Sequence, residues 1–177
     1  MIHVDEHLLL KEIEMSDAAA VFKTIDTQRE YLGKWLPFVA FTQKLEDSEK
    51  FVQSILDIPS EYREYVFAMV YDGLFAGIIG FKDTDHQNKK TEIGYWLSEK
   101  YQKKGVVTKS VKSLMTFAFE ELGMNRIQIK CATGNIPSKN IPKRLKFKFE
   151  GIERDGELLT GNIYTDIEIY SRLKNDA

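Results

Sequence analysis

A short basic segment with one glycine, residues 101–108 (Tyr-Gln-Lys-Lys-Gly-Val-Val-Thr), stands between a strand-like run and a long helical pattern. A helix that begins after such a loop presents unpaired backbone N–H groups and the positive end of its dipole, which favours an anion. Gly105 permits a tight turn close to a phosphate, and Lys103 and Lys104 add positive charge. The segment therefore predicts a pyrophosphate-binding loop. A solvated loop whose glycine serves only the turn is the alternative, and the spacing of a Walker motif is absent.

Three other positions carry side chains that could transfer a proton or attack a substrate. Glu157 follows Asp155-Gly156, and the residues alone favour an exposed carboxylate in a hairpin. Ser138 stands where a helix is expected to begin, which suits an N-cap. Cys131 lies in an alternating apolar run and is expected to be a buried structural thiol. The three histidines have no further ligands near them, so no metal site is expected.

The elements that must position these residues follow from hydrophobic periodicity and turn signals. Asp72-Gly73 between two apolar runs is typical of a tight hairpin. The order β-α-α-α-β-β-β-α-β-α-β-β predicts an α/β (α+β) fold, a mixed sheet with helices on its faces. Strands are expected at residues 8–13, 65–71, 74–81, 91–97, 126–132, 148–155 and 163–172. Helices are expected at 18–25, with Ser16-Asp17 as the N-cap, and at 27–36, 47–56, 108–122 and 138–146.

Length and composition limit the classes of function. The 177 residues suit a single domain over 1–177, with no internal repeat or linker. Lys and Arg number 25 against 27 Asp and Glu, so no global basic field favours nucleic acid. The longest apolar stretch, residues 74–81, is too short to span a membrane. An acidic N-terminus unlike a signal peptide and a single cysteine lead us to expect a cytoplasmic protein.

The order of elements and four landmarks together resemble the GNAT acetyltransferase superfamily, and most nearly its RimJ/RimL branch, which acetylates N-terminal amines of ribosomal proteins. The resemblance runs from about Leu8 to the C-terminus. It implies a mostly antiparallel mixed sheet of about seven strands, with helices on both faces and a splayed parallel pair at residues 93–97 and 127–133. The landmarks are Tyr95-Trp96-Leu97, Gln102-x-x-Gly105, Asn135-x-x-Ser138 and Asp166-x-x-x-Tyr170.

The resemblance also implies acetyl-CoA as co-substrate, without a metal. The backbone of the first landmark would pair with the pantetheine arm, and an amide near Trp96 or Leu97 would stabilise the developing oxyanion. Asn135 would hydrogen-bond to the pantetheine, with Ser138 beside it. The cofactor-binding residues implied in this way are Tyr95, Trp96, Leu97, Gln102, Lys103, Lys104, Gly105, Val106, Val107, Thr108, Asn135 and Ser138.

Two residues depart from the family pattern. Val107 stands where the family prefers Gly or Ala, which is compatible with binding if its side chain points away from the cofactor. Lys146 stands where Gly is usual before Phe147. A lysine in the left-handed conformation there would cost about 1 kcal/mol of stability without affecting the chemistry.

For catalysis, the resemblance implies Glu157 as general base and Ser138 as donor of a proton or hydrogen bond to the leaving thiolate. Tyr31 and Trp35 would line the acceptor side, with plain core packing as the alternative for Trp35. An α-amino group is about a tenth to a sixth neutral at pH 7, against about 0.04% for lysine. An N-terminal amine is therefore the easier substrate.

The expected function is an N-acetyltransferase, most simply one that acts on protein N-termini as a homodimer joined through its C-terminal strands. The same scaffold could instead serve a polyamine, an amino acid or an antibiotic amine. A non-catalytic acyl-CoA-binding regulator is a second alternative, raised by Val107. A nucleotide or phosphate binder that uses the same helix N-terminus is a third.

Overall fold

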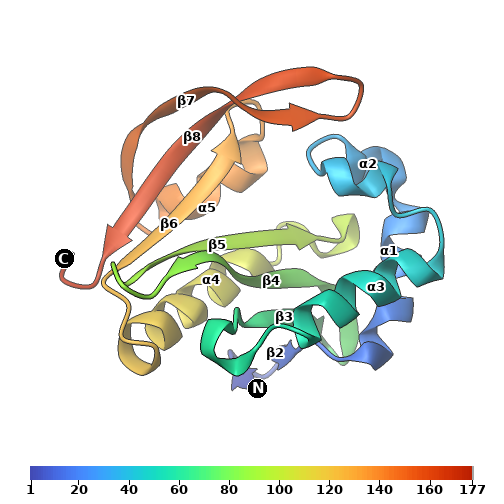
Figure 1. Cartoon of the computed structure of the whole chain (residues 1–177), viewed down its shortest axis with the longest axis horizontal. Helices are drawn as coiled ribbons and strands as arrows, with labels where there is room; N and C mark the ends of the chain where they lie inside the picture. The colour runs from blue at the N-terminus through green and yellow to red at the C-terminus, as the bar shows by residue number, and fades with distance from the viewer. Residues whose placement is uncertain (177) are drawn as a thin grey trace.

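One mixed sheet runs through the protein, and the computed structural model describes residues 1–176 (Figure 1). Eight strands lie in the order β1-β2-β3-β4-β5-β6-β8-β7, and every neighbouring pair is antiparallel except β5 and β6. The strands are β1 (Ile2–His3), β2 (Leu8–Glu12), β3 (Val66–Tyr71), β4 (Leu74–Asp85), β5 (Lys90–Leu97), β6 (Arg126–Ala132), β7 (Lys148–Leu159) and β8 (Ile163–Leu173). The α-helices are α1 (Ala18–Thr27), α2 (Arg29–Gly33), α3 (Leu45–Leu56), α4 (Val106–Thr116) and α5 (Ile136–Arg144).

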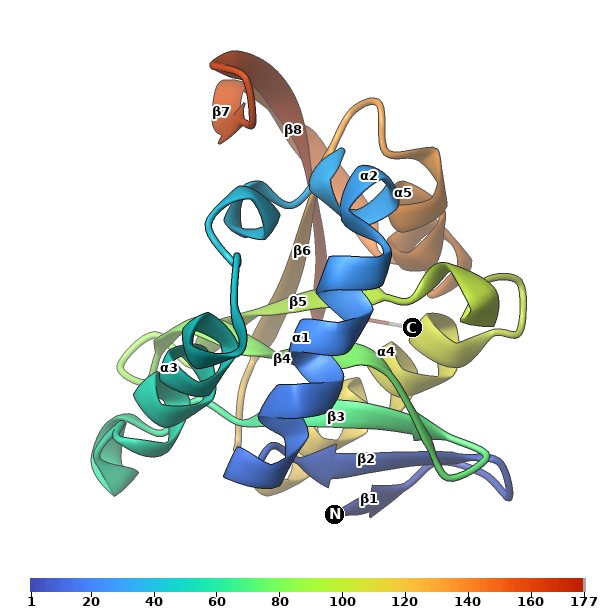
Figure 2. The same ribbon diagram turned by 90° about the vertical axis from the view of Figure 1, so that its right-hand side faces the viewer.

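The helices divide between the two faces of the sheet, and each face has its own apolar cluster (Figure 2). The first cluster packs α4 and α5 against the sheet through residues such as Val111 and Ile141. The second packs α1, α2 and α3 through residues such as Val21. Because successive strand residues point to opposite faces, β5 contributes Ile93 to the first cluster, while Trp96 packs against the second. None of the helices in residues 1–176 is long and apolar enough to cross a bilayer.

The parallel pair separates partway along its length. Pairing stops after Glu92, although β5 continues to Leu97 and β6 to Ala132. Figure 1 shows the two strands diverging from that point. The expected splay is confirmed. The pairs in register are Lys90 with Arg126, Thr91 with Ile127 and Glu92 with Gln128.

Several local predictions are confirmed by backbone angles. Asp72 and Gly73 have φ of 49° and 74° in the turn between β3 and β4. Gly123 (φ 64°) follows the long helical segment, which continues from α4 through a π-helical turn, Phe117–Glu121. Lys146 has φ of 57°, the expected left-handed conformation after α5.

The ends of several elements differ by a few residues from the sequence-based prediction, and one strand is added. The helix expected over residues 27–36 is interrupted at Gln28 (φ −134°), which separates α1 from α2. The start of the first helix agrees with the prediction, because Asp17 is the N-cap residue of α1, at the end of the 3₁₀ turn Met15–Asp17. The sheet also has one strand more than about seven, because the two-residue β1 pairs with β2.

The strand expected to end at Asp155 continues to Leu159, because Asp155-Gly156 forms a bulge rather than a turn. The register of β7 against β8 shifts between Glu153 and Glu157. The backbone N–H of Asp155 donates to the Asp166 side chain (2.9 Å), which holds the bulged residue against β8. Glu157 therefore lies within a paired strand, and the hairpin expected at Asp155-Gly156 is wrong.

The glycine opposite the end of β5 gives the first prediction. Gly77 pairs with Leu97, and a Cβ on it would lie 2.2 Å from the Trp96 carbonyl oxygen. We expect Gly77→Ala to lower the free energy of unfolding by about 2–4 kcal/mol in urea denaturation, because two backbones must move apart. Gly33→Ala is the matched control, since its Cβ would make an ordinary 3.5 Å contact with Val39. Equal stability of the two variants would contradict the prediction.

Candidate active site

The splay leaves a slot between β5 and β6. Within residues 1–176, the backbone groups of residues 93–97 that face β6 have no strand partner, because the parallel pairing ends at Glu92. Buried backbone donors and acceptors need hydrogen-bond partners. An extended ligand that carries amides can supply them. Tyr95, Trp96 and Leu97 lie on this free edge, as the sequence predicted.

The loop after β5 leads directly into α4. Gly105 (φ 75°) is the N-cap residue of α4, and no side chain caps the helix, so the amides of its first turn are open to a ligand. Val106 and Val107 are 1% and 7% exposed and belong to the apolar core. The Val107 side chain therefore points away from the loop. The departure from the family pattern at this position leaves the helix N-terminus accessible.

Two loop side chains are engaged within the protein. The Gln102 Nε2 group donates to the Tyr31 hydroxyl (2.5 Å) and so connects the loop with α2. The Lys104 ammonium lies 5.1 Å from the ring centroid of Tyr71 and 5.5 Å from that of Tyr101. Lys103 is exposed, with φ of 61°. Of the two lysines, only Lys103 has no cation–π contact within the described chain.

At the start of α5, the structure brings three predicted residues together. Asn135 is the N-cap residue, and its side-chain oxygen accepts from the Ser138 backbone N–H (3.3 Å), so the N-cap interpretation of Ser138 is wrong. The Ser138 hydroxyl donates to the Tyr95 hydroxyl (3.3 Å), which donates in turn to the Ser138 carbonyl (3.1 Å). Burial raises the pKa of Tyr95, so the phenol stays protonated. The sequence predicted a backbone role for Tyr95 and missed this side-chain contact.

A polar cluster that the sequence analysis missed occupies the point where the strands diverge. Lys82, Glu92 and Gln128 are neighbours on β4, β5 and β6. Glu92 is 3% exposed, and its carboxylate pairs with Lys82 Nζ (2.8 Å) and accepts from Gln128 Nε2 (3.0 Å). A buried charge of this kind requires such partners. The signal in the sequence was a glutamate at a buried position of an apolar strand.

Glu157 faces this cluster from β7. The Glu157 residue as a whole is exposed, but its carboxyl group is partly buried. This burial raises the pKa of the carboxyl group. Lys82 opposes the rise and Glu92 adds to it. Glu92 and Tyr95 are three residues apart and so point to opposite faces of the sheet. Glu157 and Ser138 therefore approach the slot from different faces, Glu157 beside Glu92 and Ser138 beside Tyr95.

Tyr31 and Trp35 stand at the open end of the slot. Tyr31 contacts Gln102, as described above, and Trp35 packs on Gly134, the residue before Asn135. Neither contact is plain core packing, because each connects the α2 region with a loop at the edge of the slot.

Cys131 is a buried thiol that lies near Tyr95, and His7 pairs with Asp72. Burial raises the pKa of the Cys131 thiol to about 11, and Glu168 adds to the rise, so the thiol is protonated at neutral pH. The His7 ring is 2.7 Å from Asp72, which raises the pKa of the ring. No group of three or more His, Cys, Asp or Glu side chains in residues 1–176 could hold a metal ion.

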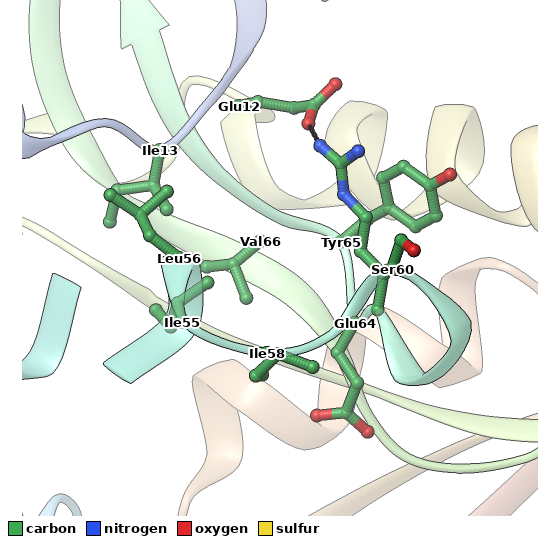
Figure 3. Close-up of a pocket in the computed structure, with 10 residues that line it drawn as sticks. Glu12, Ile13, Ile55, Leu56, Ile58, Ser60, Glu64, Tyr65 and Val66 are labelled. Carbon is green, nitrogen blue, oxygen red and sulfur yellow. Dashed lines mark hydrogen bonds and ion pairs between the residues drawn. The ribbon is translucent and has the colours of Figure 1, made fainter. Parts of the chain in front are cut away.

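Among the cavities formed by residues 1–176, two lie beside the sheet. The larger, about 300 Å³, lies between the end of α3 and the β2 and β3 strands, where Figure 3 shows Glu12 paired with an arginine. None of the predicted site residues lines it, so we do not assign the chemistry there. The other cavity, about 240 Å³, lies between residues 37–41 and the β7–β8 turn at 158–162, directly after Glu157. None of the predicted site residues lines this cavity either, although Leu158 on its wall follows Glu157 in the chain.

Comparisons with known proteins agree with this geometry. Residues 7–148 match the acetyltransferase (GNAT) domain. The protein YdaF of Bacillus subtilis (strain 168) is 35% identical over 179 residues, which cover 98% of this chain and 94% of YdaF. The ribosomal-protein-serine acetyltransferase of Escherichia coli (strain K12) is 27% identical over 172 residues, which cover 97% of this chain and 96% of that enzyme. A structure of RimL, a ribosomal L7/L12 α-N-protein acetyltransferase, in complex with coenzyme A superposes with a TM-score of 0.91 at 26% identity, covering 96% of both chains.

The cluster predicts opposite pKa changes at Glu157. Removing the positive charge with Lys82→Met should raise the pKa of Glu157, whereas removing the negative charge with Glu92→Gln should lower it. Carboxyl-carbon NMR titration, assigned with Glu157→Gln, measures both changes. Lys130→Met is the control, because Lys130 pairs with Glu153 and should leave Glu157 unchanged. Shifts of the same sign in the two cluster variants would contradict the prediction.

Proposed function

The chain belongs to the acetyltransferase (GNAT) domain family, and from that premise we propose that it acetylates the N-terminal amine of a protein, by direct attack on acetyl-CoA in a ternary complex. The coarser activity, acetyl-CoA-dependent N-acetyl transfer of the ribosomal-protein type, follows from its relatives. The proposal adds the acceptor, the residues and a cytoplasmic homodimer. A ribosomal protein is the acceptor named for the Escherichia coli relative.

The observation that carries the mechanism is the placement of Glu157 and Ser138 on different faces of one slot. A thioester bound in the slot would meet Ser138 beside Tyr95, on the face that α5 covers. An amine would enter on the other face, beside Glu157. Glu157 would then assist the attack of the amine, and Ser138 would assist the departure of the thiolate. No acyl-enzyme is needed. The protonated Cys131 thiol is consistent with direct transfer.

Glu157 is suited to accept the proton of the incoming amine. A general base works best when its pKa lies near the working pH, and partial burial moves the Glu157 pKa in that direction. An α-ammonium group has a pKa near 7.7–8.0, so it gives up its proton more readily than a lysine side chain. Ser138 would donate a hydrogen bond to the leaving sulfur by turning its single hydroxyl proton away from the Tyr95 oxygen and toward the thiolate.

A peptide acceptor suits the described surroundings of Glu157 better than a polyamine does. The cavity next to Leu158, which follows Glu157 in the chain, is lined by apolar and neutral polar residues and has no carboxylate that would hold a second amine. Tyr31 and Trp35 stand at the same end of the slot and would flank the first acceptor residue. The residues that line the cavity next to Leu158 are Pro37, Ala40, Phe41, Leu158, Leu159, Thr160, Gly161 and Asn162.

The alternative of a non-catalytic acyl-CoA-binding regulator was raised by Val107. The Val107 side chain is buried in the core and leaves the amides of α4 open.

A homodimer through the C-terminal strands is part of the same proposal. β7 is the edge strand of the sheet, and Phe149 and Ile152 on it are 56% and 53% exposed. An unpaired edge with exposed apolar residues favours contact with another chain. Sedimentation equilibrium should give twice the 20.5 kDa mass of the chain. A monomer at all concentrations would refute this part alone.

The first test of the function is calorimetric titration with acetyl-CoA, followed by detection of released thiol on adding a peptide that begins with serine or alanine. Binding and release support the proposed enzyme and acceptor. Binding with release only on adding spermidine or an amino acid would favour the small-amine alternative. Absence of binding, or preference for ATP over CoA, would refute the proposal.

Variants of the two catalytic candidates should separate rate from binding. We expect Glu157→Gln to lower kcat/KM by about 10²–10⁴-fold, and Ser138→Ala by about tenfold, because a thiolate needs little help to leave. Glu157→Gln should keep the affinity for CoA within about twofold, since it removes no group that would face the cofactor. Glu153→Gln, on the same strand and paired with Lys130, is the control. Unchanged turnover in Glu157→Gln would exclude it as the base.

A further inference from the structure

The short helix α2 and the residues that flank it contact both loops that follow the splayed strands. On the β5 side, Gln28 accepts from the Glu99 backbone N–H (2.8 Å) and donates to the Ser98 hydroxyl (2.9 Å). Tyr31 accepts from Gln102 in the same loop (2.5 Å). On the β6 side, Trp35 packs on Gly134. The α2 segment thus spans the open end of the slot, where the strands themselves no longer pair. Figure 2 shows α2 beside the loop that leads from β6 to α5.

The contact between Trp35 and Gly134 is close enough to exclude a side chain. A Cβ on Gly134 would lie 2.8 Å from Cη2 of the indole and 3.7 Å from Cζ2 and Cζ3. Gly134 is not among the residues of positive φ, so its backbone conformation does not itself require glycine. The indole accounts for the glycine at this position. Trp35 is half-buried and holds the loop through the six-membered part of its ring.

Gly134 is directly linked to the residues that face the thioester site. The next residue, Asn135, caps α5 and accepts from the Ser138 backbone N–H. On its other side the loop is held to β8 and α5, since Thr133 donates to the Asp166 carbonyl (3.0 Å) and accepts from Lys139 Nζ (3.1 Å). A shift of Gly134 toward or away from β5 therefore moves Asn135 and Ser138 relative to the slot.

We propose that Trp35 is a positioning residue which, seated on Gly134, sets the width of the open end of the slot and so places Asn135 and Ser138 against the pantetheine arm. The inference rests on the proposed function for the ligand of the slot. It differs from an acceptor-lining role for Trp35, because it acts on the cofactor side. Its consequence is that the affinity for CoA depends on the fit between one indole and one glycine.

A size exchange tests this fit. Gly134→Ala adds the clashing methyl group, Trp35→Phe removes the part of the ring that it would meet, and the double variant restores the space. We expect Gly134→Ala to raise the Kd for CoA and the KM for acetyl-CoA about tenfold, and the double variant to return to within about threefold of Trp35→Phe alone. The KM for the acceptor peptide should stay within about twofold in Gly134→Ala, which leaves the Trp35 side chain in place. Gly33→Ala, at the last residue of α2 and with only an ordinary contact, is the control.

The outcomes separate this inference from the proposed function. Wild-type protein that binds CoA, with variants whose effects on its Kd simply add, would overturn the positioning role and leave the enzyme. A change confined to the KM of the peptide would overturn it in favour of acceptor contact. If the double variant regains the melting temperature but not the affinity for CoA, the contact between Trp35 and Gly134 serves packing alone and the positioning role is overturned. Wild-type protein without CoA affinity would overturn both proposals.

Discussion

The structure depends on the failure of two neighbouring strands to stay paired. β5 and β6 share three register positions and then separate, although each continues for several residues. Backbone amides and carbonyls in the interior of a protein carry a large penalty when they have no partner. A sheet that leaves them free along its central strands is built to receive a polar extended ligand. The open N-terminus of α4 lies at the end of the same strand, where a phosphate can follow the arm.

The point of divergence is held by a charge in the interior. Glu92 sits on the last pair in register, and its carboxylate is bound by Lys82 from one side and Gln128 from the other. Removing one partner of a buried ion pair is costly, so the three residues act as a unit. Their charges also reach Glu157 and act on its pKa with opposite signs. The polar cluster at the start of the slot therefore also acts on the pKa of Glu157, the candidate general base.

The far end of the slot is held by different means. There the two halves of the sheet are connected through α2, by hydrogen bonds on the β5 side and by the indole of Trp35 on the β6 side. The polar cluster and this apolar contact define the two ends of one opening. Ser138, with Tyr95 behind it, and Glu157 lie between them on opposite faces.

The sequence by itself determined what depends on neighbouring residues. The Asp72-Gly73 turn, the helix after Gly105 and the left-handed Lys146 follow from local backbone preferences, and the order of elements with its landmarks identified the fold. Only the tertiary structure decided the site. The end of the β5–β6 pairing, the partners of Glu92, the hydroxyl contact of Tyr95 with Ser138 and the glycine under Trp35 join segments tens of residues apart. Asp155-Gly156 shows why, because a turn signal became a bulge once Asp166 on β8 bound its backbone. Register and packing of this kind are set by non-local contacts, which no local pattern encodes.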